Sequence, residues 1–401
     1  MQETTIDRND LETWAAILLN HSLGGVGPGE RVMLKGERIA WPLLEVLERR
    51  VIQAGAVPDV YLIPPNNDRG RVWSAAMGRH GQPEQLGAVP PWHLARYRSM
   101  TKYVEVLGAE DPASFSGLST DSSQSLARAD RPFADIRIAK PWVITLYPTP
   151  ALAASEGLAL EEYARFIVRA STTDPRTLLE GEQRLAPLIE GGRTVRIETE
   201  HPQDSRRLAL TMNIEAGLAR LSYGLRNLPD GEVYTSPDAS SAEGEIYLDL
   251  PVSYGGHDIQ GIYLAFEHGC ITEFSAEAGL DQLRAIIGTD DGSHRLGEVA
   301  LGMNPGLERV LKHPLFVEKV GGTLHIAIGA SYEACFTADP GSPEGRARLA
   351  ELEAAGVLNR SAQHVDLVAD FRPGGCGRRV WIDGVELEVR DRVWVAGSAV
   401  A

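Results

Sequence analysis

Two histidines and an aspartate lie in apolar, strand-prone sequence in the last quarter of the chain. His325 is part of the run Thr-Leu-His-Ile-Ala-Ile, and His364 and Asp366 begin the run His-Val-Asp-Leu-Val. Because side chains alternate across a β-strand, His364 and Asp366 should project from one face, with apolar residues on the other. A second strand could bring His325 to the same place. Two imidazoles and one carboxylate form a donor set that suits zinc, cobalt, manganese or iron.

The same spacing also fits three ordinary polar residues near sheet edges, because His-x-Asp is a short pattern. Two glutamates bear on this choice: Glu232 in Asp-Gly-Glu-Val-Tyr and Glu298 in Leu-Gly-Glu-Val-Ala. In both segments a glycine precedes the glutamate and a β-prone run follows. A glutamate that enters a buried strand is costly unless it is paired or binds a metal. The alternative is that each glutamate lies at an exposed strand start.

Size and charge limit the classes of protein that fit. A chain of 401 residues is long enough for two or three domains. Its net charge of −16 argues against nucleic acid and anionic membranes as partners, since both attract clustered lysine and arginine. There is no apolar run long enough to span a bilayer. The N-terminal stretch lacks the basic and apolar regions of a secretion signal, so we expect a cytoplasmic protein.

The three cysteines are Cys270, Cys335 and Cys376, and no two of them form a Cys-x-x-Cys pair. This number and spacing predict neither a disulfide framework nor a cysteine-based zinc site. Cys335 follows closely on the His325 run, and we expect it to be a buried structural thiol.

The first half of the chain predicts helices alternating with strands. A helix with an apolar stripe from Leu11 to Leu18 precedes a short strand at 31–35, a helix over 42–54 and a strand at 57–63. Strand, helix and strand with short connections form a βαβ unit, which predicts a parallel sheet. The unit lacks G-x-G-x-x-G and the P-loop, so no nucleotide cofactor is expected. The serine-rich region 111–132 is expected to be an exposed loop.

A strand at 139–147 and helices over 160–167 and 178–189 follow, and strands dominate from residue 194 onward. Helices are expected to interrupt them at 276–287 and 344–355. We therefore predict an N-terminal α/β domain of residues 1–192, with a parallel-containing sheet and flanking helices. Residues 193–401 are predicted to form a strand-rich α+β domain that holds the metal.

Four motifs, in this order along the chain, resemble those of the M29 family of thermophilic metalloaminopeptidases. They are Pro229-Asp-Gly-Glu232-Val-Tyr-Thr-Ser-Pro237, Gly297-Glu298-Val-Ala-Leu-Gly302, His325-Ile-Ala-Ile-Gly-Ala-Ser-Tyr332 and Asn359-Arg-Ser-Ala-Gln-His364-Val-Asp366. The similarity also includes segments 28–32, 147–150 and 160–166, so that it covers most of the chain. On these motifs the chain is identified as resembling a member of this family.

The resemblance implies a cocatalytic site with two divalent ions, zinc, cobalt or manganese, whose ligands are Glu232, Glu298, His325, His364 and Asp366. Such a pair of ions needs a bridging carboxylate and open positions for water and substrate. By the same resemblance Glu298 would also carry a proton to the leaving amine. Tyr332 would donate a hydrogen bond to the tetrahedral oxyanion, unless it is a buried core tyrosine. The implied activity is removal of N-terminal residues from short peptides or small amides by a homodimer.

The sequence departs from the family pattern beside this site. The connection between Tyr332 and Asn359 is longer than in the peptidases, and Val365 stands where the family often carries tryptophan. Three alternatives therefore remain: a small-molecule amide hydrolase, a binding protein with an inactive site, and a ring-cleaving dioxygenase of the 2,5-dihydroxypyridine type. The dioxygenase would hold one Fe(II) on His325, His364 and Asp366. The intact motifs around Glu232 and Glu298 favour the two-metal hydrolase.

Overall fold

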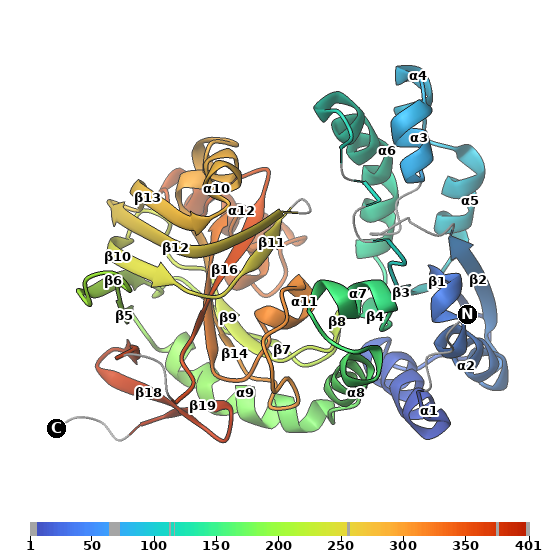
Figure 1. The fold of residues 1–401 in the computed structure, drawn as a ribbon, viewed down its shortest axis with the longest axis horizontal. Coiled ribbons are helices and arrows are strands. Elements are labelled where there is room, and N and C mark those ends of the chain that lie inside the picture. Colours follow the sequence, from blue (N-terminus) through green and yellow to red (C-terminus); the bar gives the residue numbers. More distant parts are fainter. Residues whose placement is uncertain are drawn as a thin grey trace. The chain divides into compact units, whose positions relative to one another are not determined.

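The structure is a computed structural model that describes residues 6–63, 73–111, 114–115, 117–254, 257–373 and 377–397. Contacts divide the chain into two compact units, whose elements are labelled in Figure 1. Unit 1 consists of Met1–Pro175 and Gly224–Asp230, and unit 2 of Arg176–Tyr223 and Gly231–Ala401. The predicted α/β fold class is confirmed, with a parallel sheet in unit 1 and antiparallel strands in unit 2.

Unit 1 is built on a five-stranded parallel sheet in the order β2-β1-β3-β4-β8. The strands are β1 (Arg31–Glu37), β2 (Val57–Ile63), β3 (Lys102–Leu107), β4 (Trp142–Leu146) and β8 (Asn227–Leu228). The helices are α1 (Arg8–Ala16), continued by a π-helical segment (Ile17–Ser22), α2 (Trp41–Gln53), α3 (Ala75–His80), α4 (Pro83–Leu86), α5 (Pro91–Ser99), α6 (Thr120–Ile138), α7 (Pro150–Ser155) and α8 (Leu160–Ser171).

Both faces of the unit 1 sheet are covered by helices. Leu44 of α2 lies against Gly36 on one face. On the other face Tyr97 of α5 and Phe133 of α6 pack with Met33. The strands of a parallel sheet that is covered on both faces are buried along nearly their whole length. Strand β1 shows this, because it is buried at every position from Val32 to Glu37.

The expectation of an exposed loop over 111–132 was wrong for most of that region, because α6 occupies Thr120–Ile138. The side chain of Ser119 accepts a hydrogen bond from the backbone N–H of Ser122 and caps the helix. Leu126 and Phe133 are buried on its inner face. Packing of this apolar face outweighs the weak helix propensity of the serines and aspartates that suggested a loop.

Unit 2 contains two antiparallel sheets. The larger has the order β11-β12-β10-β6-β5-β17-β18-β19, with β13 on β12, and the smaller has the order β16-β15-β14-β9-β7. The strands of the larger sheet are β5 (Thr194–Glu200), β6 (Arg207–Asn213), β10 (Glu243–Leu248), β11 (Val252–Tyr254), β12 (His257–Glu267), β13 (Cys270–Ala278), β17 (Arg379–Ile382), β18 (Val385–Arg390) and β19 (Val393–Ala396). Those of the smaller are β7 (Arg220–Ser222), β9 (Glu232–Thr235), β14 (Leu296–Gly302), β15 (Thr323–Gly329) and β16 (His364–Asp370).

The core of unit 2 is formed by apolar side chains from both sheets, with Ile246 and Leu264 from the larger sheet and Ile326 and Leu367 from the smaller. The helices of this unit are α9 (Pro175–Glu190), α10 (Leu280–Ile287), α11 (Pro314–Val317) and α12 (Pro343–Ala354). Leu185 of α9 packs in this core. The contact-based division accordingly falls after Pro175, the first residue of α9, whereas the sequence analysis placed the boundary after residue 192.

Two further details bear on the sequence predictions. The helix expected over 276–287 begins later, at Leu280, because β13 continues to Ala278. The helix expected in the long connection after Tyr332 is present as α12.

Cys335 is fully buried, as expected, whereas Cys376 lies outside the described residues. None of the described helices combines the length and the hydrophobicity that crossing a bilayer requires.

Candidate metal centre

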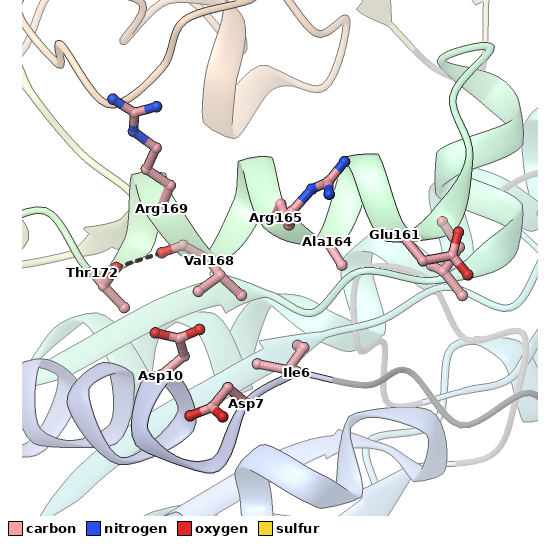
Figure 2. A pocket seen from close by; sticks show the side chains of 10 residues that line it. Ile6, Asp7, Asp10, Glu161, Ala164, Arg165, Val168, Arg169 and Thr172 are labelled. Atoms are coloured by element: carbon pink, nitrogen blue, oxygen red, sulfur yellow. Dashed lines mark hydrogen bonds between the residues drawn. The ribbon is translucent and has the colours of Figure 1, made fainter.

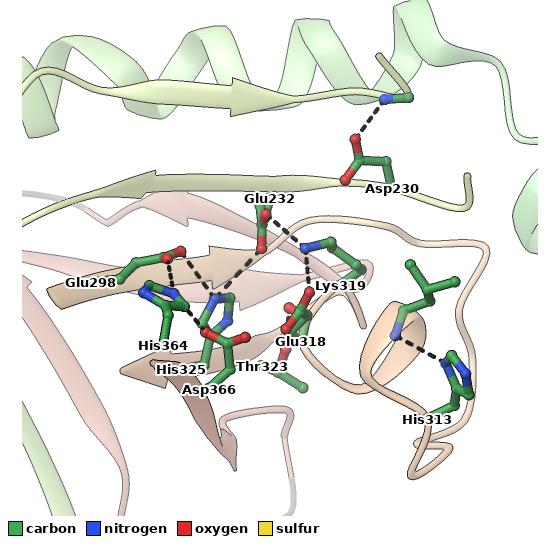
Figure 3. Close-up of polar contacts among 12 residues, drawn as sticks. Asp230, Glu232, Glu298, His313, Glu318, Lys319, Thr323, His325, His364 and Asp366 are labelled. Atoms are coloured by element: carbon green, nitrogen blue, oxygen red, sulfur yellow. Dashed lines mark hydrogen bonds and ion pairs between the residues drawn. The ribbon is translucent and has the colours of Figure 1, made fainter. Parts of the chain in front are cut away.

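The smaller sheet of unit 2 brings all five predicted ligands to one face, as Figure 3 shows. The four strands that carry them are neighbours in the order β16-β15-β14-β9. The residues are Glu232 on β9, Glu298 on β14, His325 on β15, and His364 and Asp366 on β16. Leu324, Ile326 and Ile328 alternate with His325 and are buried in the core on the opposite face. The predicted alternation of polar and apolar faces is confirmed.

Each ligand candidate has an alanine or a glycine as its partner on one adjacent strand, although His325 also pairs with Val368 and Glu232 with Ser222. Glu232 pairs with Gly302, and His325 pairs with Ala300. Ala327 is paired with both Glu298 and Asp366, and Gly329 with His364. Cross-strand neighbours on one face normally contact each other, so small partners leave space above the sheet for a bound group.

Gly329 is also required by the backbone. Its φ of +110° is a conformation that other residues rarely adopt, and a Cβ atom there would come within 2.2 Å of the Gln363 carbonyl oxygen. This close approach brings the end of β15 against the start of β16, where His364 lies.

Glu298 lies between the two histidines. Its Oε1 is 3.3 Å from Nε2 of His325, and its Oε2 is 2.9 Å from Nε2 of His364. On either side of it, Glu232 Oε2 lies 3.5 Å from Nε2 of His325 and Asp366 Oδ1 lies 3.3 Å from Nε2 of His364. A carboxylate with one oxygen toward each of two imidazoles has the geometry of a bridging ligand.

The site is buried at one end and open at the other. Glu232, Glu298 and His325 are buried, whereas the Asp366 side chain is 27% exposed. The alternative of exposed strand starts for Glu232 and Glu298 is therefore wrong. The more exposed end of the cluster is therefore the one where Asp366 lies.

His364 is held in one orientation by its surroundings. Its Nδ1 lies 2.7 Å from the carbonyl oxygen of Ala330, to which it donates a hydrogen bond, so that Nε2 is directed toward the carboxylates. The turn before it is fixed by Asn359, whose side-chain amide donates to the carbonyl oxygens of Gly292 and Gly329. The Asn-Arg-Ser-Ala-Gln-His motif thus supplies both a ligand candidate and the turn that positions it.

Two charged residues that the sequence analysis missed belong to the same cluster. Lys319 is 3% exposed, and its Nζ lies 2.7 Å from Glu232 Oε1 and 2.6 Å from Glu318 Oε1. The signal that could have found them is a Glu-Lys pair inside the apolar run Leu-Phe-Val-Glu-Lys-Val, just before β15. Charged residues in such a run are unlikely to be buried unless they are paired.

The cluster favours positive charge on its histidines in the absence of metal. Burial alone lowers the pKa of His325, but the hydrogen bond to Glu298 and the charge of Glu232 raise that pKa to about 9. Burial raises the pKa of Glu298, but hydrogen bonds to the two histidines hold it below its usual value. Burial and the charges of Asp366 and Glu232 raise the pKa of Glu318 well above its usual value. Such a site stabilises cations.

Three overlapping groups of side chains have ligand atoms close enough to hold one ion each. They are Glu232, Glu298 and His325; Glu298, His364 and Asp366; and Glu318, His325 and Asp366, with ligand atoms within 4.8 Å of one another in each group. Glu232 Oε2 and His364 Nε2 are both buried and face other ligand candidates. Oxygen and nitrogen donors that converge in this way fit a divalent metal ion.

Tyr332 lies at the open side of the cluster. Its ring centroid is 4.6 Å from that of His364 and 5.6 Å from that of Tyr234, and the residue is 44% exposed. The alternative of a buried core tyrosine is therefore wrong. The segment that follows is fixed by Arg220, whose guanidinium donates to the carbonyl oxygens of Ala334 and Thr337.

A second hollow, in unit 1, has a different character. It has a volume of about 560 Å³ and lies between the start of α1 and α8, as Figure 2 shows. Its polar lining includes Asp7, Asp10, Glu161 and Arg165, without a histidine or a cysteine. Asp7 is already used as the helix cap, because its carboxylate accepts a hydrogen bond from the Asn9 N–H. Among the described residues, the groups of side chains that could hold a metal ion lie in unit 2.

Comparison with known proteins agrees with this donor set. The family model described as "Thermophilic metalloprotease (M29)" matches residues 7–181 and 198–373. The chain belongs to the M29 family. The resemblance seen in the four motifs is thereby confirmed, and with it the prediction of a metal-dependent enzyme. Membership in this metalloprotease family implies a divalent metal ion in the protein.

Two curated relatives show how far the similarity extends. Aminopeptidase T of Thermus thermophilus is 30% identical over 317 residues, which cover 71% of this chain and 74% of that protein. Aminopeptidase AmpS of Bacillus subtilis is 37% identical over 148 residues, which cover 36% of this chain and 34% of that protein. The match to AmpS thus spans about a third of that relative, whereas the match to aminopeptidase T spans most of it.

Two solved structures share the fold. Wild-type AmpT from Thermus thermophilus superposes with a TM-score of 0.73 and 23% sequence identity, covering 98% of each chain. The 2,5-dihydroxypyridine dioxygenase of Pseudomonas putida KT2440 has a TM-score of 0.53 and 14% identity, covering 97% of this chain and 98% of that one. At these identities both likenesses concern the fold alone.

Proposed function

We propose that this protein is an aminopeptidase that removes N-terminal residues from short peptides with the help of two divalent metal ions. The observation that carries the proposal is the position of Glu298, with one carboxylate oxygen toward each of the two histidines. Membership in the M29 family and the similarity to proteins named as aminopeptidases support the same function.

One ion would be held by Glu232, Glu298 and His325, and the other by Glu298, His364 and Asp366. Bound there, divalent ions polarise a scissile carbonyl and lower the pKa of a water molecule, which makes it a nucleophile at neutral pH. Because both oxygens of Glu298 face imidazoles, we assign this residue the role of bridging ligand rather than that of proton carrier.

The chain's own side chains orient the substrate in this proposal. The Tyr332 phenol lies over His364 at the open side and would donate a hydrogen bond to the oxyanion that forms at the scissile carbonyl. The anionic surroundings of Asp366 suit a positively charged α-amine, because opposite charges attract strongly in a partly buried site. Recognition of that amine would restrict cleavage to the N-terminal residue.

The fold likeness to a dioxygenase makes an iron enzyme the second candidate. Such an enzyme would bind one Fe(II) through His325, His364 and Asp366. Among the described residues, however, no group of possible ligands contains both histidines, and Glu298 is shared between a group that holds His325 and one that holds His364. This arrangement favours the hydrolase.

Elemental analysis of protein purified without chelator, followed by assays on aminoacyl-anilides and short peptides, tests the proposal. We expect two zinc, cobalt or manganese ions per chain and release of the N-terminal residue. Peptides with an acetylated N-terminus should not be cleaved, since they lack the charged amine. A single iron per chain with oxygen uptake on dihydroxypyridines would overturn the proposal.

A further inference from the structure

Lys319 occupies one end of the metal-binding cluster. Its Nζ lies within hydrogen-bond distance of one oxygen of Glu232 and one oxygen of Glu318, and the residue is 3% exposed (Figure 3). An ammonium that is buried between two acidic side chains is held in place by its contacts with both of them. Lys319 therefore places a positive charge of the protein itself inside a cluster of side chains that could bind metal cations.

Lys319 forms an ion pair with Glu232, a residue that belongs to one of the two proposed ion positions. Glu232 belongs to the group with Glu298 and His325, and it shares its carboxylate between that group and Lys319. In the part of the chain that the structure describes, no lysine or arginine forms an ion pair with Glu298, His364 or Asp366. The two positions thus have similar donor atoms but different electrostatic surroundings.

The Glu232 carboxylate also becomes asymmetric through this contact. Its Oε1 accepts from Lys319, whereas its Oε2 faces Nε2 of His325. One oxygen only is left for an ion at that position, and the nearby ammonium repels a divalent ion through an environment that screens charge weakly. Both effects should weaken binding more at the position of Glu232, Glu298 and His325 than at the position of Glu298, His364 and Asp366, whose carboxylates do not pair with Lys319 in the described ion pairs.

We propose that Lys319 is a positioning residue that makes the two metal positions unequal. The position of Glu298, His364 and Asp366 binds its ion tightly, and the position of Glu232, Glu298 and His325 binds a weaker, exchangeable ion. In metal-free protein the same ammonium neutralises part of the carboxylate charge and keeps the cluster folded. This inference rests on the proposed two-metal function and adds an order of loading to it.

The test is a calorimetric titration of metal-free protein with Zn²⁺ or Mn²⁺, compared between wild type and Lys319→Met, which has similar length and no charge. Wild type should show two binding steps with dissociation constants at least about tenfold apart, an interval typical of one modest electrostatic interaction. In Lys319→Met the weaker step should tighten by about tenfold or more, with the tighter step unchanged within a factor of about three.

Two matched variants serve as controls. Lys319→Arg keeps the charge and should keep two unequal steps. Lys312→Met removes a lysine whose side chain is 41% exposed in an ion pair with Asp258, and it should leave both steps unchanged. Thermal unfolding gives a second readout: Lys319→Met should lower the melting temperature of metal-free protein much more than that of metal-saturated protein. A merely structural role of Lys319 would lower both temperatures equally.

The outcomes separate the two proposals. If Lys319→Met folds only with metal present, chelator competition on the loaded protein gives the same two constants. Equal steps in wild type, or a weaker step that does not tighten in Lys319→Met, would overturn this inference and leave the two-metal aminopeptidase standing. Fewer than two ions in wild type would instead overturn the proposed function.

Discussion

Each unit of this protein buries a lysine next to acidic side chains, and the two clusters differ in charge balance. In unit 1, Nζ of Lys35 lies 3.2 Å from Glu105 Oε1 and donates to the Tyr97 hydroxyl, while Tyr103 donates to the other oxygen of Glu105. In unit 2, Lys319 faces Glu232 and Glu318, and Glu298 and Asp366 follow close by. One cluster pairs a cation with one anion, whereas the other has carboxylates in excess.

This difference separates a structural ion pair from a functional site. In unit 1 the charge of Glu105 raises the pKa of Lys35 even though burial alone would lower it. The unit 2 cluster is not balanced by its lysine, so it draws protons onto its histidines when metal is absent. A buried excess of one charge that the chain does not neutralise indicates a missing ligand of the opposite charge.

The largest effect should come from removing the residue shared by both ion positions. Glu298→Gln keeps the shape of the side chain but removes the charge that both positions use. We expect kcat/KM to fall by more than roughly a hundredfold, because even residues that only support metal ligands cost tenfold to a hundredfold. Metal content should fall as well. Near-normal turnover with two ions bound would remove Glu298 from the centre of the site.

The balanced cluster should respond in stability rather than in activity. Lys35→Met leaves Glu105 buried without its cation and should cost about 3–5 kcal/mol of unfolding free energy, measured by denaturant titration. Replacing both partners, as Lys35→Met with Glu105→Leu, should recover most of this loss, since a buried ion pair is often no better than an apolar one. Metal content of the folded variants should stay unchanged, and a loss of metal would contradict the separation of the two clusters.

Metal-free protein should lose stability as the pH rises. The pKa of His325 is raised to about 9 in the folded protein, so its protonation contributes stability that is full below about 6.5 and disappears as the pH passes about 9. The loss should be about 3 kcal/mol and visible as a falling melting temperature between pH 6 and pH 9. Metal-saturated protein should show a much smaller change, because the ion replaces the proton. An equal slope in both forms would show that other groups dominate.

The smallest effect concerns the turn that positions His364. Asn359→Ala removes two hydrogen bonds to buried carbonyl oxygens and should cost about 1–3 kcal/mol of stability. The ion at the Glu298, His364 and Asp366 position should bind more weakly, since that turn fixes one of its ligands. Calorimetric titration measures this, and an Arg360→Ala variant in the same turn, exposed and on the surface, should leave metal binding intact. Equal weakening at both positions would argue against a local role.

Much of the site could be predicted because strand periodicity is local. Alternation around His325 and His364 fixes which side chains share a face, and the glycine before Glu298 coincides with an irregularity in the pairing of β14 that the motif preserves. The pairing of β14, β15 and β16 then brings these side chains together, since neighbouring strands align their faces.

Lys319 and Glu318 could not be predicted in the same way. They lie in the short connection between α11 and β15, where neither helical nor strand periodicity applies. Only the folded chain brings this connection over Glu232. The helix α6 was missed for a related reason, because the burial of Leu126 and Phe133 is decided by tertiary packing rather than by local propensity.

The order of the strands has a consequence for biosynthesis. Glu232, Glu298 and His325 leave the ribosome well before His364 and Asp366, which lie on β16 at the edge of the smaller sheet. A nascent or truncated chain that ends before β16 therefore lacks the ion position of Glu298, His364 and Asp366 altogether. In the proposed two-metal enzyme, peptide cleavage would begin only once synthesis of unit 2 is nearly complete.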